Sequence, residues 1–476
     1  MKAIVYSKEF LFYSIATLFI FVTGFSILNS TTIPVSIFLA LTGFIGLILN
    51  PSRLFWLMVF SIPFSVEYIV PSSISTDFPD ELFMISLTGI SFVIISFNPF
   101  HSIKTAIKHP FILLIVFQLL WIIVTLFFST YPILSIKYFI AKIWYIVPFI
   151  FTPQVVLQDK STFKTLAATV IIPISLIAIY ALYQHAGFGF SFLSINGCLQ
   201  PFFRNHVNYA AMLSFAFSVC FVVYLKSKTI RYRNHIGFLL IILTFALFFS
   251  YTRGSWLSVI ISIIGLLLFW RSKLMTTILV TFLFIVSLFA ILIVNDNYLI
   301  LKPSFEKTIV QNSLSKHLNS MYSNREISGA ERIHRWVAGV KMIAEKPITG
   351  FGPACYYNNY KPYTDKRFRT YVSENPEKSS VHNYYLLIWI EQGFIGFFFL
   401  LFSIYYFFKR CTYLYHTIDD LYYKQVLSIL VMVMINILVV NFFSDMIETD
   451  KVGSFFFLCI GVLIWIDSQF QLKKIA

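Results

Sequence analysis

The feature that most constrains this chain is a series of apolar segments, each long enough to cross a lipid bilayer. A bilayer core about 30 Å thick is spanned by about 20 apolar residues in helical form. Segments of that kind recur along the whole sequence, and short polar stretches separate most of them. We expect helices at residues 10–28, 32–49, 53–71, 81–97, 110–128, 133–151, 163–183, 207–225, 236–251, 254–270, 275–295, 381–408, 425–443 and 452–468.

The expected fold is therefore all-α, a polytopic transmembrane helical bundle of about 12–14 helices. Only 12% of the residues are charged and 58% are hydrophobic, whereas a soluble domain has about a quarter charged residues. The first apolar run, residues 10–28, is long for a signal peptide and lacks a small-residue cleavage site. We expect it to be retained as a helix.

The distribution of basic residues predicts the orientation of the chain. If the N-terminus lies in the cytoplasm, the short outer connections hold only Arg204, Arg253 and Lys451. The cytoplasmic connections and the C-terminal tail then hold Arg53, Lys104, Lys108, Lys160, Lys164, Lys226, Lys228, Arg231, Arg233, Arg271, Lys273, Lys409, Arg410, Lys424, Lys473 and Lys474. This asymmetry follows the positive-inside rule and explains much of the formal charge of +15 without a nucleic-acid partner.

One hydrophilic segment interrupts the helices and divides the chain into residues 1–295, 296–380 and 381–476. We expect the middle part to be a large outer loop, because it is too long for a simple turn. Within it, residues 330–343 have an apolar stripe at helical spacing, which predicts an amphipathic helix that lies on the membrane surface or caps the bundle. Residues 350–353, Gly-Phe-Gly-Pro, predict a tight turn.

The five cysteines are scattered without the spacing of a zinc or redox site. Two of them, Cys198 and Cys355, fall in segments expected outside, where they either pair as a disulfide or remain free thiols.

Several polar residues are expected at the outer ends of the helices. His382 and Asn383 lie where the hydrophilic segment meets an apolar helix. Either they begin that helix, or the imidazole serves chemistry at the lipid–water boundary. Arg253 lies between two apolar runs, where an arginine is costly unless it binds an anion or extends to lipid phosphate. Arg204 precedes another helix together with His206 and Asn208.

Two further groups of charged residues have more than one interpretation. Asp445, Glu448 and Asp450 occupy the expected turn between the last two helices. They can pair with the arginines, bind a divalent cation or form a solvated turn. Arg332 and Arg335 fit a solvated face of the amphipathic helix, although Arg332 can also join an anion site.

Four segments in order resemble the O-antigen ligase and O-antigen polymerase superfamily. They are R-x-H-x-N-x-x-A from Arg204, S-x-T-R-G-x-W around Arg253, E-R-x-x-x-W followed by K-P-I-T-G-x-G between residues 331 and 352, and H-N-x(7)-E-x-G-x-x-G from His382 to Gly396. Each motif alone is weak, and the set in this order is more specific. The resemblance covers about residues 201–396.

The resemblance implies a GT-C-like membrane glycosyltransferase of the bacterial inner membrane with its active site facing the periplasm. It implies a glycan on undecaprenyl diphosphate as donor, lipid A-core or a second lipid-linked glycan as acceptor, and no cofactor or metal. Carried over by position, Arg204 and Arg253 match the arginines that contact the diphosphate, and His382 matches the essential histidine. We assign Arg332 to the same anion site, and His206, Asn208, Asn383, Asp445 and Glu448 to supporting roles.

The chemistry of these residue types agrees with that implication. Guanidinium groups can hold a diphosphate and stabilise the charge that grows on it as the sugar–phosphate bond breaks. A histidine can accept the proton of the attacking sugar hydroxyl, and direct displacement would invert the anomeric centre. In a competing hypothesis, His382 or His206 binds phosphate as an imidazolium. At the level of the whole protein, we prefer a ligase slightly to a polymerase, and both to an exporter or flippase of the same glycan.

Overall fold

The computed structural model describes residues 51–70, 74–97, 106–301, 327–368, 373, 375 and 378–475. The helices expected at 10–28 and 32–49 lie outside the described residues, as does much of the predicted outer loop. Within the described residues, nine helices are long and apolar enough to cross a membrane. The chain is a polytopic helical membrane protein, as the hydropathy pattern predicts.

The transmembrane bundle and its ends are built from these elements in chain order. The helices are α3 (Pro51–Ser61), α4 (Asp80–Phe97), α6 (Pro110–Leu126), α7 (Pro132–Val156), α8 (Lys160–Gly187), α9 (Ile195–Cys198), α10 (His206–Lys226), α11 (Ile230–Phe249), α12 (Arg253–Trp270), α13 (Leu274–Ile293), α15 (Ile327–Glu345), α16 (Tyr356–Asn359), α17 (Tyr384–Thr417), α18 (Leu421–Val440) and α19 (Asp450–Ile475). Short 3-10 segments are η1 (Ile62–Phe64), η2 (Phe192–Ser194), η3 (Val294–Leu301), η6 (Lys361–Tyr363), η7 (Lys366–Phe368) and η8 (Met446–Glu448).

The helix expected at residues 53–71 is wrong in its second half. Helix α3 ends at Ser61, and an antiparallel hairpin follows in which β1 (Val66–Val70) pairs with β2 (Ile74–Phe78). Pro63 cannot donate to a helical ladder, and the β-branched and aromatic residues of β1 favour a strand. A short apolar run does not by itself distinguish a strand from a helix, which is why hydropathy missed the hairpin.

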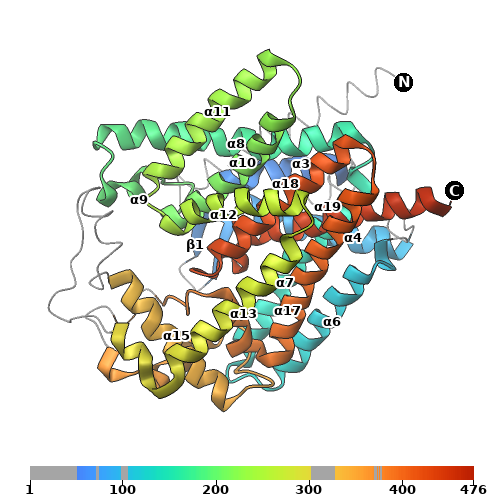
Figure 1. The fold of residues 1–476 in the computed structure, drawn as a ribbon. Helices are drawn as coiled ribbons and strands as arrows, with labels where there is room; N and C mark the ends of the chain where they lie inside the picture. The colour runs from blue at the N-terminus through green and yellow to red at the C-terminus, as the bar shows by residue number, and fades with distance from the viewer. Residues whose placement is uncertain are drawn as a thin grey trace.

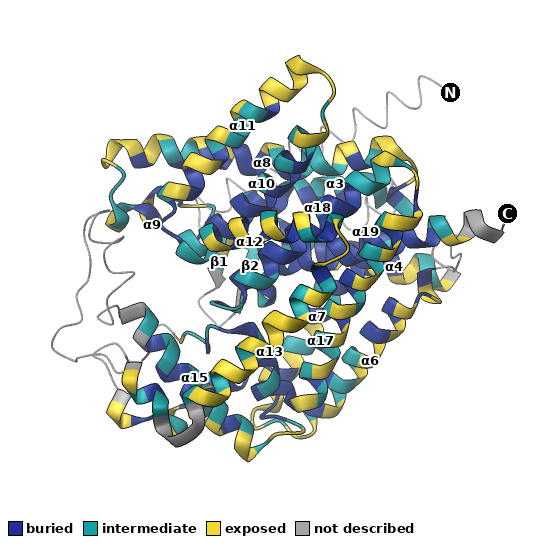
Figure 2. Cartoon of the chain, viewed as in Figure 1, coloured by how far each residue is buried: buried dark blue, intermediate teal, exposed yellow. Residues whose placement is uncertain are grey.

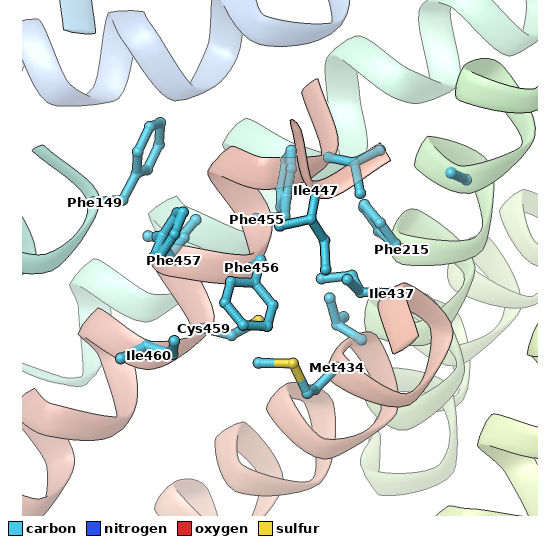
Figure 3. Packing of buried hydrophobic residues seen from close by; sticks show 14 of the residues in the cluster. Phe149, Phe215, Met434, Ile437, Ile447, Phe455, Phe456, Phe457, Cys459 and Ile460 are labelled. Carbon is cyan, nitrogen blue, oxygen red and sulfur yellow. The ribbon is translucent and has the colours of Figure 1, made fainter. Parts of the chain in front are cut away.

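Helix α19 forms the core of the bundle. In its membrane-spanning stretch, 94% of the residues are buried. Figure 3 shows Phe455, Phe456 and Phe457 of this helix packed among side chains of the neighbouring elements. The approach to α7 is close, because a Cβ atom at Gly461 would lie 2.1 Å from the carbonyl oxygen of Phe149. Only glycine allows backbones to pack at that distance.

The periphery of the bundle is apolar and exposed, as a lipid-facing surface must be. Only 6% of the spanning window of α13 is buried, and Figure 2 shows the exposed faces of α13 and α6 along the outside of the bundle. Exposed apolar surface of this extent would be unfavourable in water and is favourable against acyl chains.

Basic residues collect at one end of the helices, which we call the basic end. There Lys160 pairs with Asp420 at 2.6 Å, and the Lys226 ammonium lies 4.8 Å from the centre of the Trp270 ring. Asp467, at the end of α19, binds both His109 and Arg410. These contacts join the start of α8 to that of α18, the end of α10 to that of α12, and the end of α19 to the start of α6 and the end of α17.

The opposite end, where α7, α10, α12, α17 and α19 begin, is called the site end. Helix α15 lies across this end and packs against α17 (Figure 1). The Trp336 ring of α15 contacts the rings of Phe289 and Phe442. The amphipathic helix expected at residues 330–343 is therefore present, and it caps the bundle.

Candidate functional site

His382 lies two residues before α17 in an unusual backbone conformation. Its φ is +52°, in the left-handed region that costs a non-glycine residue about 1–2 kcal/mol. The amide N–H donates to the hydroxyl of Ser380 at 3.2 Å, which helps to hold this conformation. Strained conformations of this kind persist where the surroundings fix them, and they concentrate at functional sites.

A carboxylate faces the imidazole of His382. The Nδ1 atom lies 3.8 Å from Oδ1 of Asp445, and the hydroxyl of Ser380 donates to the other oxygen of the same carboxylate. A separation of 3.8 Å is longer than a hydrogen bond, which needs about 2.7–3.2 Å. A small shift on substrate binding can close it, because catalytic contacts are often long in the absence of substrate.

Two arginines of α15 act on the same imidazole. Burial, the guanidinium of Arg335 and that of Arg332 together lower the pKa of His382 to about 3. The imidazole is therefore neutral near neutral pH, with one ring nitrogen able to accept a proton. Burial has the opposite effect on the acid beside it and raises the pKa of Asp445.

Arg335 corrects the expectation of a solvated helix face. The residue is buried, and its guanidinium lies 3.4 Å from the carbonyl oxygen of Ser380 and 3.6 Å from the carboxylate of Glu331. Sequence reasoning left it out of the site because its position on α15 gave no sign of what covers the helix.

Asn383 fixes the start of α17. As the N-cap residue it accepts from the amide of Leu386 at 3.0 Å, and its side-chain amide donates to the carbonyl oxygen of Phe442 at 3.1 Å. The next amide, of Tyr384, donates to the carbonyl oxygen of Asn441 at 2.9 Å. These bonds hold the helix start against residues 441–449, which we call the α18–α19 turn and which include Asp445.

Helix α17 is broken at Gly393, and the segment before α16 binds to the break. Gly393 has φ +67°, and a Cβ atom there would lie 1.9 Å from the carbonyl oxygen of Ile348. The amides of Phe351 and Gly352 donate to carbonyl oxygens of α17 at 2.9 and 3.0 Å. Gly350 and Gly352 also have positive φ, as the predicted tight turn requires.

Glu391 strengthens this junction. Its side chain is buried and accepts from the amides of Ala354 and Tyr356 at 2.9 and 3.0 Å. The two bonds provide hydrogen-bond partners for a carboxyl group that is buried away from water. Glu391 therefore fixes the segment that follows the turn and does not face His382.

Glu448, predicted as a supporting residue, pairs with a lysine, a partner that was not among the three alternatives for this turn. Its carboxylate oxygens lie 2.9 and 3.0 Å from the ammonium of Lys142, and the hydroxyl of Tyr138 donates to it at 3.0 Å. Lys142 is buried within α7, which agrees with an inward-facing lysine. The ion pair joins α7 to the α18–α19 turn.

Arg204 extends from the site end toward the β hairpin. Its side chain is 70% exposed, and one guanidinium nitrogen lies 3.7 Å from a carboxylate oxygen of Glu67 in β1. Next to it, Asn205 caps α10 by accepting from the amides of Val207 and Asn208. The guanidinium of Arg204 is thus accessible, while the backbone beside it begins a helix.

The segment after Arg204 contacts the start of α12. The hydroxyl of Thr252 donates to the carbonyl oxygen of His206 at 3.2 Å, and Arg253 follows as the first residue of α12. The Nδ1 atom of His206 lies 2.9 Å from the side-chain oxygen of Asn196. The side-chain oxygen of Asn208 is buried and has no hydrogen-bond partner within the described part of the chain.

The α18–α19 turn connects this arginine segment to His382. A Cβ atom at Gly254 would lie 3.6 Å from the ring of Phe443, which lies two residues before Asp445. The segment that begins with Arg204 thus contacts the start of α12 through Thr252, the start of α12 approaches the α18–α19 turn at Phe443, and this turn carries Asp445, which faces His382. The structure brings together the segments that hold Arg204, Arg253, Arg332 and His382, although they are far apart in the sequence.

The remaining expectations concern cysteines and metals. All five cysteines are buried and free, so Cys198 and Cys355 do not form a disulfide. Among the residues that the structure describes, no three His, Cys, Asp or Glu side chains are grouped so that they could hold a metal ion.

Comparison with known proteins gives a match that overlaps this site. Residues 238–401 match the family model described as O-antigen ligase. The matched segment begins in α11 and ends in α17, so it contains Arg253, Arg332 and His382, whereas Arg204 and Asp445 lie outside it. A protein of Haemophilus influenzae, described as uncharacterized, is similar at 27% identity over 166 residues. That alignment covers 34% of this chain and 39% of the relative.

Proposed function

We propose that this chain, which belongs to the O-antigen ligase-like superfamily through residues 238–401, transfers a glycan from undecaprenyl diphosphate to the hydroxyl group of an acceptor sugar. The family match supports a membrane enzyme that transfers lipid-linked glycans. The finer assignment is a ligase with lipid A-core as acceptor. The reaction takes place at the periplasmic face of the bacterial inner membrane, at the site end of the bundle.

The observation that carries the proposal is the position of His382. A neutral imidazole faces Asp445 on one side, and the α18–α19 turn connects it to the start of α12, where Arg253 lies. A base that accepts the proton of a sugar alcohol must be neutral before the reaction, and a lowered pKa provides that state. A diphosphate needs cations near this base, and we assign that role to Arg204 and Arg253.

The proposed reaction is one displacement. The acceptor hydroxyl oxygen attacks the anomeric carbon of the donor, and a new glycosidic C–O bond forms as the bond to phosphate breaks. The electron pair of the broken bond leaves with undecaprenyl diphosphate, whose charge Arg204 and Arg253 stabilise. The hydroxyl proton passes to Nε2 of His382, because Nδ1 faces Asp445. The anomeric configuration inverts.

Asp445 and the α15 arginines adjust the base. Asp445 orients the ring and stabilises the imidazolium that forms as the proton arrives. Arg335 and Arg332 keep the ring neutral before the reaction, and Arg332 also adds positive charge to the anion site. His206 and Asn208 support the donor site beside Arg204. Asn383 fixes the start of α17 next to His382, and Glu448 fixes the α18–α19 turn that carries Asp445.

The family match equally suits a polymerase, which would join lipid-linked repeat units with the same residues. An exporter or flippase has less support. A transport path needs polar groups spaced through the membrane, whereas the polar contacts of the described helices gather mainly at the basic end and the site end. Lys142 lies deeper in the bundle, where it is bound to Glu448.

The first experiment is transfer by the purified protein in detergent. The donor is a glycan on undecaprenyl diphosphate, the acceptors are lipid A-core and a second lipid-linked glycan, and mass spectrometry identifies the product. We expect transfer without nucleotide sugar and a loss of about 10²- to 10⁴-fold in kcat for His382→Ala. His235→Ala, an exposed histidine near the basic end, is the control. Near-normal transfer by His382→Ala would exclude the proposed base.

Deletion of the gene in its host separates the two acceptors. A ligase leaves lipid-linked polymer that is not transferred, so capped lipid A-core disappears. A polymerase leaves lipid A-core capped with single repeat units. If capping is unchanged and the export of another glycan is altered, the transfer reaction on lipid A-core is wrong.

A further inference from the structure

Lys451, the second residue of α19, has an ammonium group that is buried at the site end. It donates to the carbonyl oxygens of Ser65 and Phe202 at 2.8 Å each, and to that of Ile62 at 3.4 Å. An ammonium has three donors, and here each has an acceptor from the backbone. One side chain thus ties α19 to two segments that are distant in the sequence.

One of those segments leads directly to Arg204. Phe202, whose carbonyl oxygen accepts from Lys451, lies two residues before it. The ring of Phe203 lies below the ammonium, with its centre 4.6 Å from Nζ, and this ring is buried. Packing against Tyr209 adds a second contact at 5.6 Å between ring centres. The backbone before Arg204 is therefore fixed by its hydrogen bond to the Lys451 ammonium and by the packing of the Phe203 ring against that ammonium and Tyr209.

The other segment leads to the partner of Arg204. Ile62 and Ser65 lie directly before β1, and β1 carries Glu67, whose carboxylate lies 3.7 Å from Arg204. Lys451 therefore binds the backbone just before Arg204 and also the backbone just before the strand that carries Glu67. The guanidinium itself stays exposed and able to change partners.

A buried ammonium also needs negative charge nearby. The carboxyl groups of Asp77 in β2, Asp80 in α4 and Asp450 are close enough to interact electrostatically with Lys451. Burial and Asp450 raise the pKa of Asp77 to about 8, and Lys451 acts against them. Charge balance is thus a second role open to Lys451, and an experiment must separate it from the hydrogen bonds to the two segments.

We propose that Lys451 is a positioning residue that fixes the backbone beneath Arg204 and so aims its guanidinium at the donor diphosphate. The inference rests on the proposed function, because it assigns the diphosphate to Arg204. A guanidinium on a fixed base loses less freedom on binding than one on a loose segment. Displacement of such a group by about 1 Å can lower a rate by about a hundredfold.

The test measures binding of undecaprenyl diphosphate to the full-length protein in detergent, together with the thermal unfolding temperature. Lys451→Met removes the donors and keeps much of the side-chain volume, and we expect its Kd to rise at least about tenfold. Lys451→Arg keeps charge and donors and should restore part of the affinity. Lys160→Met, which removes an exposed ammonium at the basic end, is the matched control and should bind as the native protein does.

A second variant separates position from charge. Lys451→Gln removes the positive charge and keeps a side-chain N–H group that can donate to the backbone oxygens. We expect Lys451→Gln to bind more tightly than Lys451→Met, because part of the support for the backbone before Arg204 is kept. If the two variants bind equally weakly while Lys451→Arg binds as the native protein does, Lys451 acts through its charge and the positioning role is wrong. This variant also serves if Lys451→Met alone does not fold.

Arg204→Ala, measured in parallel, distinguishes the two hypotheses. If it binds undecaprenyl diphosphate as tightly as the native protein, the diphosphate role of Arg204 fails whatever Lys451 does. If Arg204→Ala binds weakly and Lys451→Met binds normally, only the positioning inference fails. If both are weak, the combined variant Lys451→Met/Arg204→Ala should bind no more weakly than Arg204→Ala, because Lys451 acts through Arg204.

Discussion

The Nδ1 atom of His382 lies 3.8 Å from Oδ1 of Asp445. His382 precedes α17 and Asp445 lies in the α18–α19 turn, and the hydroxyl of Ser380 donates to the same carboxylate. The pair is close enough for electrostatic coupling and too far apart for a hydrogen bond. Its closure during the reaction gives the first prediction.

We predict that Asp445→Asn lowers kcat by roughly ten- to a hundredfold, because the ring loses the charge that orients it and stabilises the imidazolium. The KM for donor should change little, since the arginines are untouched. Steady-state kinetics with varied donor concentration measures both values. An unchanged kcat would mean that Asp445 only supports the α18–α19 turn.

The pH dependence of transfer follows from the lowered pKa of His382, which is about 3. An imidazole with that pKa is deprotonated at pH 5 and above, so its contribution to kcat/KM stays constant from pH 8 down to pH 5. Arg335→Gln removes one of the charges that lower this pKa, so the pKa should rise and the loss of activity at acid pH should begin at a higher pH than in the native protein. Arg335→Lys keeps the charge and is the control.

A pH–rate profile of the native enzyme decides between the two roles of His382. If the residue bound phosphate as an imidazolium, activity would be lost as the pH rises through its pKa. Such a loss between pH 5 and 8 would contradict the neutral base.

The Lys142–Glu448 pair makes a prediction about stability. Loss of one partner leaves a buried charge alone, so Lys142→Met should lower the free energy of unfolding by about 3–5 kcal/mol. Lys142→Met combined with Glu448→Gln should recover most of that loss. Thermal or denaturant unfolding in detergent measures the difference. Equal destabilisation in the single and double variants would show that the pair does not matter as an ion pair.

The control for that prediction is Lys160→Met, which breaks an ion pair whose side chains are 53% and 34% exposed. We expect a change of no more than about 1 kcal/mol, because solvent screens exposed pairs.

Gly393→Ala should prevent correct folding. A methyl group would overlap the carbonyl of Ile348, and the φ of +67° is itself unfavourable for alanine. Folded yield after membrane extraction and gel filtration measures the effect. Gly89→Ala in α4 is the control, because no atom of the described residues lies within 4 Å of the added atom, and alanine is about 1 kcal/mol better than glycine in a helix. Normal yield for Gly393→Ala would contradict the break in α17.

Glu67→Gln should improve donor binding. Glu67 competes with the diphosphate for Arg204, and an exposed ion pair contributes up to about 1 kcal/mol. We expect the KM for donor to fall by up to about fivefold, with kcat unchanged. Glu345→Gln, an exposed acid of α15, controls for the loss of negative charge at the site end. A raised KM would indicate that Glu67 holds Arg204 in its active position.

Much of this architecture is predictable from the sequence, because hydropathy and helical periodicity are local properties. The starts of α10 and α17 follow from their asparagine caps, and the amphipathic stripe of α15 identifies a capping helix. The motifs around Arg253 and His382 indicate the site through their resemblance to a family. None of these inferences needs to know which residues meet in space.

The contacts that build the site are not local, and they were missed for that reason. Lys142 is conspicuous as a lysine in an apolar run, yet its partner Glu448 is 306 positions away. Nothing near Arg335 indicates that the segment before His382 covers it. The hairpin that carries Glu67 resembles a helix in hydropathy, and the three acceptors of Lys451 are backbone oxygens, which leave no trace in the sequence.

The break in α17 also restricts the construction of chimeras. The carbonyl oxygens of Ile390 and Glu391 accept from the amides of Phe351 and Gly352, and the amide of Phe394, which would bond to Ile390 in a regular helix, donates to the carbonyl oxygen of Pro347. A loop exchanged between relatives to transfer acceptor specificity must therefore bring the stretch 346–352 and the first half of α17 as one cassette. If the loop alone were exchanged, the carbonyl oxygens of α17 could lose the amides that donate to them, and the membrane offers no water to replace those donors.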